Sequence, residues 1–485
     1  MIDKTTKVFQ YSGRSVALII FLLALLIRVI FFFFGTPVYF GEAGIHVGGD
    51  TGWWTKAVEN LIEFGTYSTD LNMPNGYFYR PPGYAIFLAP LKVFLGDWDS
   101  VYRVFVIIQI ILDSFVAVIF FKIALLITEK IQPAIIAGLL YSLYVFSFGW
   151  TPVIYPESLS VFFLSLGVFF FLKALKSNLG SKHMLISGVC LGIAALMRIQ
   201  LVLLLPIPLV IFLIYNYKGF SFSSLKPYLF FIFGVIFTYG LWPARNLINH
   251  QKPVFTQRLD DARHWSSDFM AFREFMWAIK TDVEPEFTQL MAGENINWPK
   301  SANLSKIDSL EIKKALILMD SCGVGFRTWR MSNGYEHMVT SHAGNCNSEI
   351  ALLWNNLTTR QKKNNTLHYS IQVPLQNLKK VFFKSDLVGG RTLLIVKIAF
   401  GLRSGLILFG LAGIVYMLRK QKLIFRQAGL FILAIYLSEV MFFCFWFRSI
   451  EIRYFLQIDS LLLIPAGVFL SFVLKLLKQK WKTVI

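Results

Sequence analysis

An aspartate lies where the first long apolar segment gives way to a polar loop, within Gly48-Gly49-Asp50-Thr51-Gly52. Apolar residues recur at helical spacing directly after it, so we expect a helix to begin here. The Asp50 carboxylate could act as a general base at this edge of the apolar region. Residue type alone favours a plainer interpretation, in which Asp50 or Thr51 only caps the helix.

A second charged position is Arg80, which is followed by Pro81-Pro82-Gly83-Tyr84 and then by an apolar segment. The proline at position 81 keeps Arg80 out of the helical region and presents its cation on an extended backbone. The guanidinium could simply reach lipid headgroups. Alternatively, its planar fork could hold a phosphate through two hydrogen bonds.

Further charges lie at the predicted ends of apolar segments, at Glu157, Arg198, Arg245, Glu451 and Arg453. Each of them alone could be a membrane anchor, and Glu157 also suits the start of a helix. Together they would place several arginines and carboxylates on one face of a membrane. This combination suits transfer from a lipid phosphate, because a base activates an acceptor hydroxyl while cations stabilise the departing phosphate.

Several other kinds of site are not indicated by the sequence. It contains no Walker-type glycine loop, no His-Glu-x-x-His motif and no nucleophile elbow. The histidines lack the spacing of metal ligands, so no metal is assigned. The net charge of +19 comes with basic residues clustered beside apolar segments. That pattern is typical of membrane proteins rather than of nucleic-acid binding.

The elements that must position these residues are membrane helices. Hydrophobic residues make up 55% of the 485 residues and charged residues only 15%, against roughly 25% in soluble proteins. Several apolar runs reach the roughly 20 residues that cross about 30 Å of hydrocarbon. The first, residues 16–34, carries one charge, Arg28. It is too long for the core of a signal peptide, so we interpret it as a retained span.

Ten spans fit the hydropathy, and the chain is expected to be an all-α polytopic membrane protein. Their approximate limits are 15–35, 101–127, 133–150, 153–173, 184–198, 200–216, 227–244, 391–418, 425–446 and 453–474. The fifth and sixth are short and could form a hairpin that does not cross, so the number stays open. With ten spans the flanking basic residues fall on one side, which predicts cytoplasmic termini.

Three regions follow from this arrangement. Residues 1–244 form an N-terminal transmembrane module with a first outer loop at 35–100. Residues 245–390 form an α-rich or mixed extracytoplasmic domain, and residues 391–485 form the last transmembrane helices and a cytoplasmic tail. Cys322 and Cys346 lie in the outer domain. They could pair if that side is oxidising, but the sequence does not place their Cα atoms.

The order of the motifs resembles the GT-C superfamily of glycosyltransferases. The nearest pattern is that of bacterial relatives of protein O-mannosyltransferases and of the aminoarabinose transferase that modifies lipid A. The matching positions are Asp50 after the first span, Arg80 to Tyr84, Trp242 to Asn246 and Arg453-Tyr454. This chain has Trp-Pro where relatives often have Pro-Trp, so Arg245-Asn246 is the informative part of the third motif.

The resemblance implies a GT-C type fold and an inverting transfer from a polyprenyl-phosphate sugar. It implies that Asp50 is the catalytic base and that the donor phosphate is bound by Arg80, Arg245 and Arg453. The acceptor or cavity residues would be Glu157, Tyr84, Arg198, Glu451 and Tyr454. The acceptor would be a glycan, a lipid or a protein, and no nucleic acid is expected. Metal use varies in the superfamily, so a divalent metal remains open.

The implied location is the bacterial inner membrane, with the protein in contact with membrane lipids and the active site on the periplasmic face. Two alternatives remain at this stage. A transporter or flippase of lipid-linked saccharides would share the spans and the charged cavity, although transporters often carry internal repeats and none is seen here. A glycan ligase or polymerase with a lipid-diphosphate donor would need similar cations.

Overall fold

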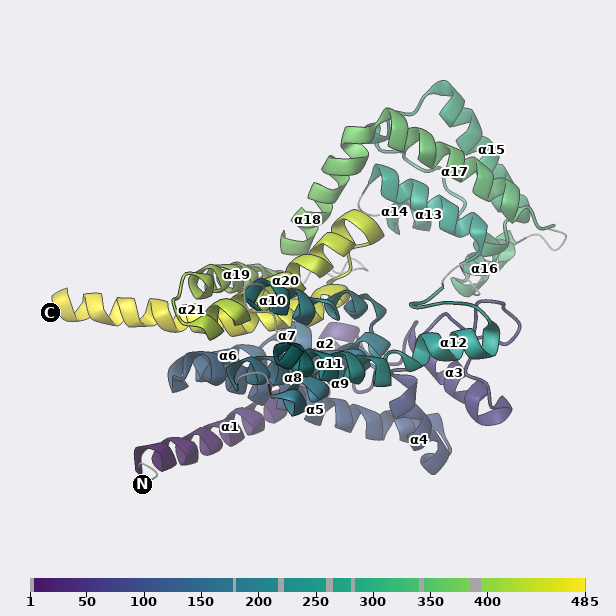
Figure 1. The fold of residues 1–485 in the computed structure, drawn as a ribbon. Helices are drawn as coiled ribbons and strands as arrows, with labels where there is room; N and C mark the ends of the chain where they lie inside the picture. The colour runs from purple at the N-terminus through teal and green to yellow at the C-terminus, as the bar shows by residue number, and fades with distance from the viewer. Residues whose placement is uncertain are drawn as a thin grey trace.

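The computed structural model describes residues 4–177, 180–216, 222–258, 265–280, 284–339, 344–383 and 394–484. Throughout these ranges the regular elements are helices, and an isolated bridge joins His46 to Val153. The predicted all-α fold of a polytopic membrane protein is therefore confirmed. Figure 1 shows a bundle of long helices with a second group of helices standing beside it.

Six helices in the described residues are long and apolar enough to cross a membrane. The first joins α1 (Lys4–Ile30), η1 (Phe31–Gly35) and α2 (Thr36–Phe40), and the fifth joins α20 (Leu423–Met441) to η7 (Phe442–Phe447). The others are α5 (Trp98–Thr128), α8 (Glu157–Lys176), α19 (Leu394–Leu418) and α21 (Ile452–Val484). A seventh span results if α11 (Phe222–Thr238) and α12 (Leu241–His250), bent by 45°, are counted together.

The predicted number of ten spans is not confirmed, because three of the apolar segments fold as shorter helices. These are α6 (Ile131–Ser142), α9 (Ser181–Met197) and η2 (Ile199–Leu204) with α10 (Ile207–Asn216). The segment 133–150 is interrupted at Tyr144, whose backbone is extended, before the short α7 (Val145–Phe148). Hydropathy counts apolar residues without detecting such breaks, so it overestimates the length of helix.

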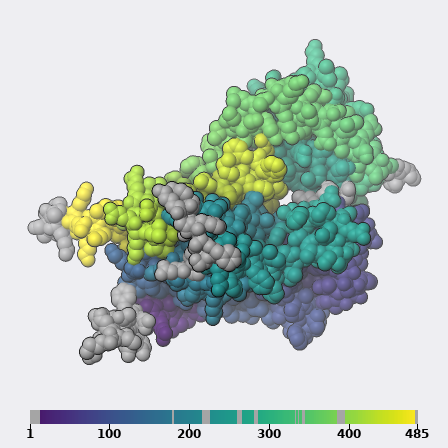
Figure 2. Space-filling view, viewed as in Figure 1, coloured from purple at the N-terminus to yellow at the C-terminus, as the bar shows by residue number. Residues whose placement is uncertain are grey.

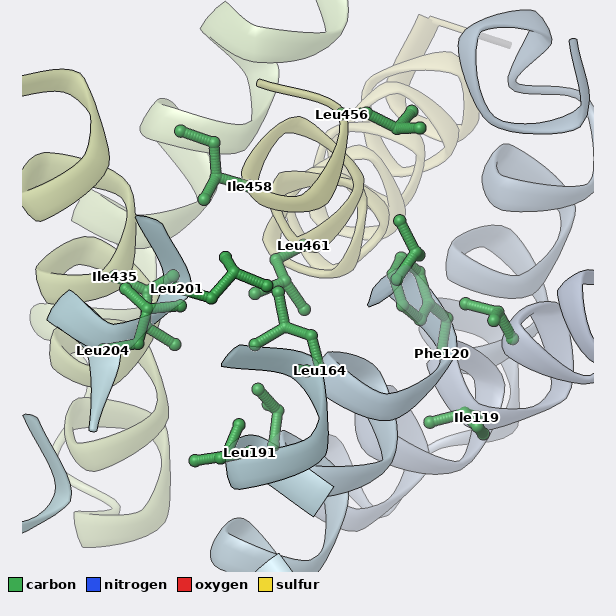
Figure 3. Packing of buried hydrophobic residues seen from close by; sticks show 14 of the residues in the cluster. Ile119, Phe120, Leu164, Leu191, Leu201, Leu204, Ile435, Leu456, Ile458 and Leu461 are labelled. Carbon is green, nitrogen blue, oxygen red and sulfur yellow. The ribbon is translucent and has the colours of Figure 1, made fainter. Parts of the chain in front are cut away.

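The core of the bundle holds together the elements that carry the site residues. In Figure 3, Leu164 of α8, Leu201 of η2 and Leu461 of α21 meet at the centre of the packing. Glu157 begins α8, Arg198 directly precedes η2 and Arg453 lies in the first turn of α21. Burial of apolar surface stabilises the packing of these helices by about 25 cal/mol per Å². Because the leucines hold the three helices together, they also fix the three charged residues relative to one another.

The outer helices have a hydrophobic core of their own, centred on the buried Trp354. They are α13 (Ser267–Ile279), α14 (Glu284–Met291), α15 (Lys306–Cys322), α16 (Val324–Ser332) and α17 (Asn347–Asn364). We call this group the outer unit. It returns to the bundle through η6 (His368–Gln372) and α18 (Val373–Phe383). The predicted boundary of the outer domain at residue 390 lies outside the described residues.

Cys322 and Cys346 form a disulfide, with Cα atoms 5.6 Å apart, which resolves the question that the sequence left open. The bond joins the end of α15 to the residue before α17. α15 begins with a capping box between Ser305 and Asp308, and Arg360 of α17 pairs with Asp308 at 2.8 Å. Covalent and charged links thus hold the two helices at both ends.

Both chain ends lie at one end of the bundle, and the loops of the first outer region lie at the other (Figure 1). This region contains α3 (Thr51–Phe64) and α4 (Ala85–Leu95). The outer unit is on the same side as these loops. Figure 2 shows it in green above the bundle, with the yellow segment that joins α20 to α21 reaching toward it.

Candidate active site

Asp50 is held at the start of α3 by contacts between its loop and the residues before α8. The backbone N–H of Asp50 donates to the Tyr155 hydroxyl at 3.0 Å, and Thr51 Oγ1 donates to the carbonyl of Ile154 at 3.1 Å. A Cβ at Gly49 would come within 3.3 Å of that Tyr155 hydroxyl, so a residue without a side chain suits this approach. Asp50 occupies the N-cap position, but its side chain makes no capping hydrogen bond.

The Asp50 carboxylate is instead shared between two arginines. Arg80 Nη2 lies 2.7 Å from Asp50 Oδ1, and Arg453 Nη1 lies 2.8 Å from Asp50 Oδ2. Arg453 also pairs with Glu451 at 2.6 Å, and the Tyr454 hydroxyl donates to Glu451 at 2.8 Å. The guanidinium of Arg80 lies over the rings of Trp54 and Tyr79, at 4.9 Å from each. The Asp50 carboxylate is therefore the centre of a charged cluster. The interpretation that the Asp50 side chain only caps the helix is wrong.

Two opposing effects set the pKa of Asp50. Burial raises it, because the charged form loses solvation. The positive charges of Arg80, Arg453 and Arg198 lower it, and together they outweigh burial, so the pKa of Asp50 lies below its ordinary value of 3.8. Asp50 is consequently an anion at neutral pH.

The cluster forms the floor of a cavity of about 850 Å³ between the bundle and the outer unit. Aromatic residues of the outer unit form the facing wall, among them Trp265, Trp277 and Trp329. Trp265 Nε1 donates to the Tyr79 hydroxyl at 2.8 Å, which joins the wall to the floor. The remaining lining residues that concern the site are Arg198, Arg273, Lys362, Tyr369, Trp446, Arg448, Glu451 and Tyr454.

With this geometry in view, comparison with known proteins is informative. The family model described as dolichyl-phosphate-mannose-protein mannosyltransferase matches residues 80–242. The apo structure of the Archaeoglobus fulgidus oligosaccharyltransferase has a TM-score of 0.50 at 16% identity, and the alignment covers 98% of this chain and 52% of that one. This protein has a GT-C fold.

Other solved structures show weaker likeness. AglB from the same archaeon, in complex with an inhibitory peptide and a dolichol-phosphate, gives a TM-score of 0.48 at 14% identity, covering 98% of this chain and 52% of AglB. ArnT from Cupriavidus metallidurans bound to undecaprenyl phosphate gives 0.35 at 13% identity, covering 96% and 78%. The chain thus spans about half the length of the oligosaccharyltransferases. No curated protein matches it significantly.

The GT-C fold brings most of the predicted site residues together. Asp50, Arg80 and Arg453 form the ion-paired cluster, with Glu451 and Tyr454 attached to it. Glu157 and Arg198 form a second, deeper pair, with Arg198 Nη1 3.2 Å from Glu157 Oε1. Glu157 is fully buried, and its partner Arg198 lines the cavity, with a guanidinium 5.2 Å from the Tyr454 ring centre.

Two predicted residues lie elsewhere in this GT-C fold. Tyr84 is fully buried behind the floor, where its hydroxyl donates to Gln109 Oε1 at 3.1 Å. Arg245 donates to the carbonyls of Tyr67 at 2.6 Å and Tyr77 at 2.9 Å, so it braces the first outer loop. The structure does not place either among the residues that line the cavity.

One charged residue near the site was not predicted. Glu439 of α20 is fully buried, and neither of its carboxylate oxygens has a hydrogen-bond partner in the described part of the chain. The Glu439 carboxylate interacts electrostatically with the Arg198 guanidinium. A glutamate within a predicted span is itself a signal of function, and the sequence interpretation missed it by considering only charges at the rim.

Among the described residues no group of three or more histidine, cysteine, aspartate or glutamate side chains could hold a metal ion. The chemistry that the site itself supplies is one carboxylate between guanidinium groups, facing an enclosed volume. Such a site can bind a phosphate and deprotonate a hydroxyl beside it.

Proposed function

We propose that this protein is a membrane glycosyltransferase. It transfers a sugar from a polyprenyl-phosphate donor to a hydroxyl group of an acceptor on the outer face of the membrane. The observation that carries the proposal is the position of Asp50 between Arg80 and Arg453 on the floor of the cavity. The family model that matches residues 80–242, named for dolichyl-phosphate-mannose, supports a sugar donor on a lipid phosphate.

Arg80 and Arg453 bind the donor phosphate in this proposal. Each already makes a charge-assisted hydrogen bond to an oxygen of Asp50. A donor phosphate offers more acceptor oxygens than one carboxylate and competes for the same donors. As the arginines turn to the phosphate, they hold Asp50 less tightly, and its basicity rises at the moment when the acceptor must be deprotonated. Arg198 adds a third positive charge to the leaving phosphate.

Asp50 acts as the general base in the transfer. The acceptor oxygen forms a bond to the anomeric carbon while its proton passes to a carboxylate oxygen of Asp50. The bond from the anomeric carbon to the phosphate oxygen breaks, and its electron pair stays with polyprenyl phosphate, whose negative charge the arginines stabilise. One displacement from the face opposite the phosphate inverts the anomeric centre.

The disulfide and the positions of the chain ends support the assignment of the cavity to the outer face of the membrane. Cys322 and Cys346 are paired in the outer unit, and disulfides persist in oxidising compartments such as the bacterial periplasm. Both chain ends lie at the opposite end of the bundle (Figure 1). We therefore place the termini in the cytoplasm of a bacterial inner membrane and the cavity on the periplasmic side.

A transfer assay separates this function from transport. The full-length protein is reconstituted in sealed vesicles with a polyprenyl-phosphate sugar labelled in the sugar, and a membrane fraction lacking the protein supplies acceptors. We expect free polyprenyl phosphate to accumulate while the label moves to another molecule. If the label instead stays on the donor and only changes its side of the vesicle membrane, the protein is a transporter and the proposal fails.

A further inference from the structure

The cavity has a second cationic region, away from Asp50, whose most buried member is Arg448. Arg448 directly follows η7 as its C-cap residue and is 6% exposed. Its guanidinium lies 3.7 Å from the centre of the Tyr369 ring. Arg448 Nε donates to the carbonyl of Phe445 at 3.0 Å and Nη1 to that of Trp277 at 3.4 Å. These contacts fix the side chain at the wall of the cavity.

The backbone of Arg448 is also unusual. Its φ angle is 58°, in the left-handed region. A residue other than glycine pays roughly 1–2 kcal/mol for this conformation. The backbone N–H of Arg448 caps η7 by donating to the carbonyl of Phe443 at 2.9 Å, an arrangement that commonly ends helices on a left-handed residue. This capping bond and the contacts of the side chain with Tyr369 and Trp277 together accompany the left-handed backbone.

A second cation faces the same ring. Lys362 Nζ lies 5.4 Å from the centre of Tyr369, and Lys362 and Arg448 both line the cavity. In the described ranges, no carboxylate lies within 4.0 Å of either cation, and Glu274, an exposed carboxylate of the same cavity, makes no salt bridge with them. By contrast, Arg80 and Arg453 share Asp50, and Arg198 has Glu157.

A buried guanidinium without a carboxylate is costly unless an anion completes its environment. We propose that Arg448, Lys362 and Tyr369 form an anion-binding subsite, which takes a phosphate or carboxylate group of the acceptor while an acceptor hydroxyl reaches Asp50. This inference rests on the proposed glycosyltransferase function and specifies its acceptor as an acidic molecule. Tyr369 supplies an aromatic face and Arg448 a planar fork of N–H donors.

The location of the subsite favours the acceptor, rather than the donor, as the molecule that binds there. Its partners come from α13, α17 and η6, whereas Asp50 and Arg80 belong to the first outer loop. Arg448 precedes Arg453 by five residues, so their Cα atoms are at most about 17 Å apart, and one small molecule can contact both regions. Trp446, which lies two residues before Arg448 and also lines the cavity, is 83% exposed.

Binding measurements on the full chain in a non-ionic detergent test the subsite without any turnover. Undecaprenyl phosphate first saturates the donor site, and inorganic phosphate or glucuronate is then titrated by calorimetry. We expect both anions to bind, and Arg448→Gln and Lys362→Gln each to weaken them about 10-fold, which is 1.4 kcal/mol. Glucose, which lacks a charge, should not distinguish the variants. Unchanged anion affinity in both variants would overturn the proposal.

The control is Lys363→Gln, because Lys363 is the exposed neighbour of Lys362 and does not line the cavity. Lys362 is itself exposed, so its variant keeps the test decisive even if Arg448→Gln fails to fold. Affinities for undecaprenyl diphosphate and monophosphate are compared as well. If Arg448→Gln weakens only the diphosphate, the subsite belongs to the donor and the acceptor assignment is wrong. If the binding prediction fails, the proposed function still stands or falls by the transfer assay on the wild-type protein, so the two failures can be told apart.

Discussion

Asp50 serves two purposes at the level of single residues. It neutralises Arg80 and Arg453, which lie on either side of it and are each about 20% exposed or less. It also offers the carboxylate that a transfer reaction needs. The same ion pairs that keep Asp50 anionic make it a weak base, so its reactivity depends on what the two arginines bind. In the proposed reaction, donor binding and activation of the base would thereby be linked through two side chains.

Replacement of Arg80 tests its role in binding the phosphate. Arg80→Ala removes a charge-assisted hydrogen bond of about 1.5–3 kcal/mol, so the Kd for undecaprenyl phosphate should rise about 10- to 100-fold. Direct binding in detergent measures it. Arg103→Ala is the control, since Arg103 is exposed at the outer end of α5. An unchanged Kd for Arg80→Ala would exclude Arg80 from the phosphate site.

The depressed pKa of Asp50 predicts how its contribution to stability depends on pH. A carboxyl group whose pKa is lower in the folded state stabilises the fold at pH values above its unfolded pKa, near 3.8. This stabilisation is lost as the pH falls through the pKa of the folded state. The difference in Tm between the wild type and Asp50→Asn should therefore be constant from pH 8 to about pH 5 and should shrink below 3.8. A difference that already disappears near neutral pH would contradict the ion-paired state.

Motif order singled out the residues of the ion-paired cluster, but not every predicted residue lies beside them. Asp50, Arg80 and Arg453 are joined as predicted, although residue type alone had favoured a helix cap for Asp50. Arg245 follows the expected motif, yet its guanidinium turns to two backbone carbonyls of the first outer loop. Sequence order cannot give the direction of a long side chain, because that direction depends on which loop folds beside it.

At the level of elements, a buried ion pair joins the first span to α5. Arg28 Nε lies 2.6 Å from Asp113 Oδ2, both side chains are fully buried, and Asp113 also accepts from Tyr141 and Ser147. Charges inside a membrane bundle need partners. Arg28, visible in the sequence as the one charge of the first span, thus has a structural explanation, and its partner could not be identified before the helices were placed.

Asp113→Asn should destabilise the bundle, because it leaves the Arg28 charge buried without its partner. A loss of about 3–5 kcal/mol is typical when one partner of a buried pair is removed, and the apparent Tm in nanodiscs measures it. The double variant Arg28→Met, Asp113→Leu should recover most of that loss, since apolar residues of similar size often replace such pairs at little cost. An Asp113→Asn protein as stable as the wild type would show that the pair is dispensable.

At the scale of the whole molecule, the cavity exists because two separate cores face each other. The bundle supplies the charged floor, and the outer unit supplies an aromatic wall through Trp265, Trp277 and Trp329. Composition and motif order predicted the all-α membrane bundle, an α-rich or mixed region outside it and the gathering of charged residues around Asp50. They did not predict the wall or the Arg448 subsite, because these depend on packing between segments far apart in the sequence.

The central claim is that Asp50 is the base of a glycosyl transfer, and the activity of Asp50→Asn tests it most directly. Polyprenyl phosphate released from the labelled donor is measured for the reconstituted variant, with Glu63→Gln, an exposed carboxylate near the end of α3, as the control. We predict a loss of at least about 100-fold for Asp50→Asn, with cooperative unfolding within a few degrees of the wild type, and full activity for Glu63→Gln. A folded Asp50→Asn protein with wild-type transfer would contradict the account.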